Sequence, residues 1–141
     1  MTKQELSQLY HLNREIEGMQ TRLQELETLA VSCTGNITGM PKIPGISDKV
    51  GKYTAEIADL RSLLDISLKK CFHELNRLNR YINSVEDSRM RLILSLRYIN
   101  GLSWKQVAFS IGEYDEQYPR RKHNKFLKQS KNDEDDELNV I

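Results

Sequence analysis

The chain has no long apolar run, and this lack excludes a helix that crosses a membrane. Such a helix needs about 18 or more consecutive apolar residues, whereas only 38% of the 141 residues are hydrophobic and 29% are charged. The first ten residues, MTKQELSQLY, also lack the basic start and apolar stretch of a secretory signal peptide. We therefore expect a cytoplasmic protein with no membrane partner and no large single core.

Cysteine and catalytic motifs are also scarce. The two cysteines, Cys33 and Cys71, lie in different segments without a CxxC spacing, so we expect reduced thiols. Cys71 and His73 are two residues apart and would point to different faces of a helix, which makes them a poor metal pair. The sequence contains no Gly-rich phosphate loop, paired-histidine metal motif or Ser/His/Asp constellation. It predicts a protein that is not an enzyme and has no cofactor or metal.

What the chain does have is helical periodicity. Thr2 and Glu5 have the spacing of a capping box, which marks a helix start. Apolar residues then recur three and four apart, as in one narrow seam of a helix: Leu9, Leu12, Ile16, Met19, Leu23, Leu26 and Ala30. This helix should end near Ser32, because glycines and prolines follow in CTGNITGMPKIPGIS. A loop is expected over about 33–46.

A second and longer helix is predicted from Ser47-Asp48 to about Asn83. Its seam reads Val50, Tyr53, Ile57, Leu60, Leu64, Leu68, Cys71, Leu75, Leu78 and Ile82. At 1.5 Å per residue it would be a rod of roughly 50 Å, longer than the first helix. Residues 1–83 are thus predicted to form a long antiparallel helical hairpin, similar to a coiled coil. Because part of the second helix would remain uncovered, we expect a homo-oligomer.

The net charge of +1 conceals an uneven distribution. Residues 84–131 contain ten basic and five acidic residues, whereas residues 132–141 contain five acidic residues and no base. A basic region indicates a surface for a polyanion, and a short acidic run is typical of disorder. We expect residues 131–141 to form an acidic disordered tail.

Three short helical signals fill residues 84–130. Ser84 and Asp87 could cap a helix through SRMRLILSLRYI, which Asn100-Gly101 would end. Ser103 and Gln106 form another capping box, before a helix that Gly112 would end. The third helix lies within 115–130. Three compact helices with a basic last one indicate a helix-turn-helix unit, whose last helix enters the major groove of DNA.

The last helix separates into two faces at 100° per residue. Pro119, His123 and Phe126 share one face, with Lys122 at its edge, and His123 is interpreted as a packing or phosphate-contacting residue. Arginine can pair with guanine, asparagine with adenine, and lysine neutralises phosphate. Arg120, Arg121 and Asn124 are therefore the candidates for base contacts, and Lys105, Lys125 and Lys128 for backbone contacts. The predicted DNA-binding set consists of these six residues and Gln117.

The motifs of this unit resemble known DNA-binding proteins. RLILSLRYINGLSWKQVAFSIG is similar to the start of the region-four domain of bacterial sigma factors, and RKHNKFL is similar to the R-x-H-x-K-x-L ending of a related set. The whole chain resembles the RinA/ArpU-like late-transcription regulators of phages and prophages in Gram-positive bacteria, including the loop TGMPKIPGISDKVGKY. The resemblance covers most of residues 35–128. It implies a sigma-like helix-turn-helix behind a coiled-coil segment, and a role in phage gene transcription.

The sequence departs from that pattern at Pro119, which stands where the pattern has an apolar residue inside the last helix. One extra residue also separates Gly112 from this helix. Proline costs about 3 kcal/mol inside a helix but almost nothing in its first turn. If Tyr118 caps the helix, Pro119 becomes its first residue. This arrangement, preferred to a cap at Asp115, predicts a turn over about 112–118.

The fold class expected is all-α: a long helical hairpin over 1–83, then a helix-turn-helix unit over 84–130. The function expected is a phage transcription regulator that binds double-stranded DNA in the bacterial host cytoplasm. Two alternatives remain open. One is a DNA-packaging assembly protein similar to a small terminase subunit. The other is an adaptor whose partner is RNA polymerase.

Overall fold

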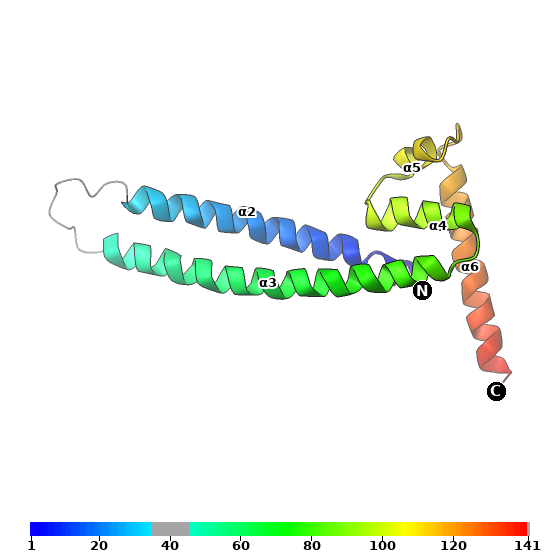
Figure 1. The fold of residues 1–141 in the computed structure, drawn as a ribbon, viewed down its shortest axis with the longest axis horizontal. Helices are drawn as coiled ribbons and strands as arrows, with labels where there is room; N and C mark the ends of the chain where they lie inside the picture. Colours follow the sequence, from blue (N-terminus) through cyan, green and yellow to red (C-terminus); the bar gives the residue numbers. More distant parts are fainter. Residues whose placement is uncertain (35–45, 141) are drawn as a thin grey trace. The chain divides into compact units, whose positions relative to one another are not determined.

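The computed structural model describes residues 1–34 and 46–140, and these residues form helices and no strand (Figure 1). The helices are α1 (Lys3–Leu6), α2 (Gln8–Thr34), α3 (Ile46–Ser84), α4 (Ser88–Leu94), the π-helix η1 (Ser95–Ile99), α5 (Trp104–Ser110) and α6 (Tyr118–Asn139). The all-α fold class is confirmed. The predicted loop at about 33–46 falls almost wholly outside the described residues.

Residues 12–71 form one compact unit, built from most of α2 and the first part of α3. The two helices run in opposite directions, because contacts pair later residues of α2 with earlier residues of α3. Glu27 Oε1 lies 2.7 Å from Arg61 Nη2, and the Ser67 hydroxyl lies 3.7 Å from the Met19 sulfur. Figure 1 shows these segments side by side.

The seam of this unit follows the predicted periodicity except at Leu68. Ile16 and Leu26 are buried, whereas Leu68 is 46% exposed. Ser67 takes its place in the seam and faces Met19. The predicted seam was therefore wrong at one position. The seam has two consecutive steps of four, from Leu60 to Leu64 and on to Leu68. Because a helix has 3.6 residues per turn, these two steps rotate Leu68 by about 80° away from Leu60, whereas Ser67 stays close to the seam.

The other unit combines residues 1–11 with 72–141. Its core is made by apolar side chains from every helix in it. The buried residues are Leu6, Leu9, Leu78, Ile82, Val85, Met90, Ile93, Leu94, Tyr98, Val107, Ala108, Pro119 and His123. Contacts join α4 to α6, and α5 to both α6 and η1. The first residues of the chain thus share a core with residues 72–141. The predicted domain boundary at residue 83 therefore does not coincide with the boundary between the two compact units.

The helix starts differ in detail from the sequence prediction. The capping box of Thr2 and Glu5 is confirmed, since each side chain bonds the other residue's backbone amide. The first helix nevertheless breaks at Ser7. At α4 the cap is Asp87, whose carboxylate accepts the Arg89 amide at 2.9 Å. Ser84 does not cap this helix, because its hydroxyl donates to the Tyr81 carbonyl instead.

The start and end of α5 agree with the prediction. Ser103 and Gln106 form a capping box at its start. At its end, Gly112 has a φ of +78°, and the Glu113 amide donates to the Ala108 carbonyl while the Gly112 amide donates to Phe109. These two bonds form a Schellman motif, which needs a left-handed residue that glycine supplies without strain. The chain therefore turns sharply before α6.

The acidic end of the chain is helical over most of its length. We expected a disordered tail over 131–141, but α6 continues to Asn139. Within this stretch Glu134 Oε1 lies 3.7 Å from the N-terminal amine of Met1. Disorder was predicted from charge alone, which neglects that extending a helix already started at Tyr118 is easier than starting a new one. None of the helices in the described ranges is long and apolar enough to span a membrane.

Candidate nucleic-acid interface

The start of α6 is set by the residues around Pro119. Gln117 is the cap and Tyr118 the first helical residue, so Pro119 is the second. The predicted start was one residue too late. The missing amide of Pro119 costs no helical hydrogen bond there, because the first four amides of a helix have no partner within it. The side chain of Pro119 is buried, so it anchors the first turn against the core.

The buried face of α6 is fixed one turn later by His123, which is fully buried. Its Nε2 atom lies 2.6 Å from the Tyr98 hydroxyl of η1, and its ring lies 4.9 Å from the Trp104 ring of α5. Its Nδ1 atom lies 3.0 Å from Oδ1 of Asn124. His123 thus joins α6 to both preceding helical segments. This supports its interpretation as a packing residue.

Electrostatics keep this pair neutral. Burial is the main cause that lowers the pKa of His123 below its usual value; the hydrogen bond to Asn124 offsets part of this effect, and the cations Lys3 and Arg97 add to it. Burial raises the pKa of Tyr98 to about 12. A neutral imidazole has one donor and one acceptor. With Nδ1–H donating to Asn124, Nε2 is left to accept the Tyr98 hydroxyl proton.

The opposite face of α6 carries the predicted contact residues. All seven members of the predicted DNA-binding set are exposed: Lys105, Gln117, Arg120, Arg121, Asn124, Lys125 and Lys128. Six of them lie within one broad face of α6 or at its cap, at helical spacing from one another. The seventh, Lys105, lies on α5, which contacts α6. The structure therefore brings the set to one helix and its neighbour.

Three members of the set have partners that the sequence did not reveal. Arg121 pairs with Asp115, and Lys105 Nζ lies 3.6 Å from Glu116 Oε1. The Asn124 side chain accepts from His123. Both acidic partners, Asp115 and Glu116, lie in the irregular turn before α6. The backbone path of such a turn does not follow from the periodicity of the sequence. For this reason the pairs could not have been predicted from spacing alone.

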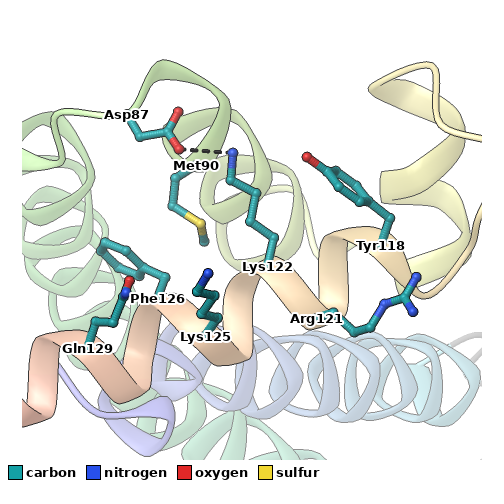
Figure 2. Close-up of a pocket in the computed structure, with 8 residues that line it drawn as sticks. All are labelled: Asp87, Met90, Tyr118, Arg121, Lys122, Lys125, Phe126 and Gln129. Carbon is teal, nitrogen blue, oxygen red and sulfur yellow. Dashed lines mark ion pairs between the residues drawn. The ribbon is translucent and has the colours of Figure 1, made fainter.

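A groove between α4 and α6 adjoins this face, with a volume of about 450 Å³. Figure 2 shows its lining residues: Asp87, Met90, Tyr118, Arg121, Lys122, Lys125, Phe126 and Gln129. Lys122 extends across it, and its Nζ lies 2.9 Å from Asp87 Oδ2. The ammonium group of Lys122 lowers the pKa of Asp87. Lys122 is therefore held by the α4 cap, whereas Arg121 and Lys125 remain exposed.

Two further arginines of this unit hold its backbone. Arg91 donates to the carbonyls of Val85 at 2.6 Å and Glu86 at 2.9 Å. Arg97 donates to the Leu102 carbonyl at 2.8 Å and lies 4.7 Å from the centre of the Trp104 ring. A basic residue with such partners is not free to meet a ligand. Within residues 84–131, the exposed cations other than Arg89 therefore lie on α6 and at the start of α5.

Within the described part of the chain, no group of three or more His, Cys, Asp or Glu residues could hold a metal ion. Cys71 is a free thiol, whose sulfur lies 3.1 Å from Asn13 Oδ1. Comparison with protein-family models, with curated proteins and with solved structures gives no match to this chain.

Proposed function

We propose that this protein binds double-stranded DNA through a helix-turn-helix formed by α4, η1, α5 and α6, with α6 as the recognition helix. The observation that carries the proposal is the two-faced character of α6. One face is buried through Pro119 and His123, while the other presents exposed Arg120, Arg121 and Lys125. Such a helix is held rigidly and offers its cations outward.

The chemistry of the exposed face suits the major groove, which is about 12 Å wide and admits a helix. Arg120, Arg121 and Asn124 lie in the first two turns of α6, where recognition helices contact base edges. Lys105, Lys125 and Lys128 are placed to neutralise phosphates on either side, and Gln117 adds a polar side chain at the cap. Base reading is thus assigned to three residues and backbone contact to the others.

We further propose that the protein oligomerises through α2 and α3, which form the long helical hairpin preceding the DNA-binding unit. Within residues 12–71, Leu63 is 53% and Ile66 is 50% exposed on α3. Because about half of each side chain is still exposed, burying it between subunits is favourable by about 1 kcal/mol. Sedimentation of the wild type and of Leu63→Ser/Ile66→Ser tests this. A smaller species for the double variant is expected, and equal masses at monomer size would contradict oligomerisation.

The biological role proposed is regulation of phage or prophage transcription in the host cytoplasm. It is supported by the resemblance of the sequence to phage late-transcription regulators. Mobility shifts on fragments of the parent genome test it, with the expectation that one fragment carrying a promoter is retarded at salt concentrations where the others are free. Equal retardation of all fragments at every salt concentration would contradict a sequence-specific regulator and favour the packaging role.

A matched pair of variants makes the same assay specific for α6. Arg121→Ala removes a cation of the proposed recognition helix, whereas Arg80→Ala removes an exposed arginine of α3. Loss of one arginine contact to a base pair costs about 1–3 kcal/mol, or roughly 5- to 150-fold in affinity. Only Arg121→Ala should show this loss. If the wild type retards no DNA even at low salt, the DNA-binding proposal fails and the polymerase adaptor is favoured.

A further inference from the structure

The turn between α5 and α6, residues 113–117, sets two carboxylates against the proposed DNA-contacting cations. Asp115 pairs with Arg121 of α6. Glu116 Oε1 lies 3.6 Å from Nζ of Lys105 on α5. Each of the two helices therefore has one of its proposed contact residues paired with an acid from the same short turn.

The Asp115 carboxylate is fixed on the turn, whereas its partner is not. Its Oδ1 accepts the Gln117 amide at 3.0 Å, and its backbone carbonyl accepts the Tyr118 amide at 3.2 Å. The Arg121 side chain is 68% exposed and reaches the other carboxylate oxygen. A long exposed side chain can leave such a pair for another anion, because exposed ion pairs are weak. Arg121 can thus exchange Asp115 for an acceptor on DNA.

Lys105 has the same freedom. Its side chain is 78% exposed and that of Glu116 is 56% exposed. The five proposed cations of this face are Lys105, Arg120, Arg121, Lys125 and Lys128, and the two carboxylates reduce their charge from +5 to +3. DNA that approaches Arg121 or Lys105 must displace a carboxylate, and its phosphates remain close to that carboxylate. Both effects oppose binding of a polyanion.

We propose that Asp115 and Glu116 compete with DNA for Arg121 and Lys105, and so limit the affinity of this protein for DNA of any sequence. The inference rests on the proposed function, because it assigns a role to residues beside the same surface. The carboxylates lower the salt concentration at which the protein releases DNA.

The test uses amide substitutions that keep the shape of each side chain. Asp115→Asn removes the charge but retains an oxygen that can accept the Gln117 amide. Glu116→Gln makes the same change in the pair with Lys105. Glu113→Gln is the matched control, since Glu113 lies in the same turn but pairs with Arg89 of α4. Affinity for a 25-base-pair duplex is measured by fluorescence anisotropy over a range of salt concentrations. Thermal unfolding confirms that each variant is folded.

Asp115→Asn and Glu116→Gln should each tighten binding about 3- to 10-fold near 0.1 M salt and steepen the salt dependence by up to about 0.9 per freed contact. Glu113→Gln should change affinity less than about twofold, because its charge acts from farther away through screened solvent. In the Arg121→Ala background, Asp115→Asn should lose most of its effect.

Weaker binding by Asp115→Asn would overturn the proposal and show instead that Asp115 orients Arg121. An effect equal to that of Glu113→Gln would also overturn it, because general charge would then explain the result. These outcomes are distinct from failure of the proposed function, in which the wild type itself does not bind the duplex at low salt.

Discussion

At the scale of single residues, His123 determines how α6 is held. It is fully buried, accepts the Tyr98 hydroxyl and contacts the Trp104 ring. A charged imidazole in this position would meet two cations, Lys3 and Arg97, and no compensating carboxylate acts on its pKa. The docking of α6 therefore depends on a neutral histidine.

Protonation of His123 should make stability depend on pH. Its pKa in the folded protein is lowered from the usual 6.5, so the unfolded chain binds the proton more tightly. The free energy of unfolding should be constant above about pH 6.5 and fall as the pH decreases below it, by up to about 1.4 kcal/mol per pH unit. Urea unfolding between pH 5 and 8 measures this. His123→Gln should flatten the curve in that range, and an unchanged slope would contradict the account.

The Tyr98 hydroxyl should contribute to stability through the same pair. Tyr98→Phe leaves the buried Nε2 of His123 without a donor, which should cost about 1–3 kcal/mol of unfolding free energy. Tyr114→Phe is the matched control, because Tyr114 is fully exposed and should change stability by less than about 0.5 kcal/mol. Equal effects of the two substitutions in urea unfolding would show that the Tyr98–His123 hydrogen bond contributes nothing.

The sequence alone indicated which residues lie on each face of α6, but not which side chains they contact. A helical spacing of 100° per residue placed Pro119 and His123 on one face of the last helix and the basic residues on the other. The burial of these side chains in the structure agrees with that prediction. The contact between Tyr98 and His123 spans 25 positions, and no local pattern connects them. The pairs of Asp115 and Glu116 likewise depend on the path of an irregular turn. Tertiary contacts of this kind follow from packing, which one sequence does not display.

At the scale of helices, the short segments are specified by their ends. Ser103 and Gln106 start α5, and the left-handed Gly112 ends it. These signals are local in the chain, which explains why they were predictable. The extent of α6 was not, because its acidic last residues carry no stop signal and continue the helix to Asn139. Charge composition alone was a poor guide there.

The turn before α6 should be sensitive to Gly112. Gly112→Ala places a side chain at a φ of +78°, which costs about 1–2 kcal/mol for a residue other than glycine. No neighbouring atom lies within 4 Å of the added carbon, so the cost is purely conformational. Gly18→Ala in α2 meets equally open space but lies inside a helix, and should stabilise by about 0.5–1 kcal/mol. Thermal unfolding of both variants checks the opposite signs, and the same sign for both would contradict this reading of the turn.

At the scale of the whole molecule, the regions of the chain differ in charge. The net charge is only +1, yet α6 passes from exposed basic residues at its start to acidic residues near its end. This single helix thus offers a polyanion one attractive end and one repulsive end. On α3, Leu63 and Ile66 are about half exposed, and the proposed self-association would bury them. Binding to DNA and self-association are then assigned to different residues.

The salt dependence of DNA binding tests the central claim most directly. The affinity for a duplex is measured between 50 and 300 mM salt for the wild type, Lys125→Ala/Lys128→Ala on α6, and the matched control Lys52→Ala/Lys70→Ala on α3. Each phosphate contact contributes about 0.9 to the slope of log affinity against log salt. We predict that the α6 double variant loses close to 2 from the slope while the control retains the wild-type value. Equal slopes for the two double variants, or no binding by the wild type at the lowest salt, would contradict the claim that α6 is the DNA-binding helix.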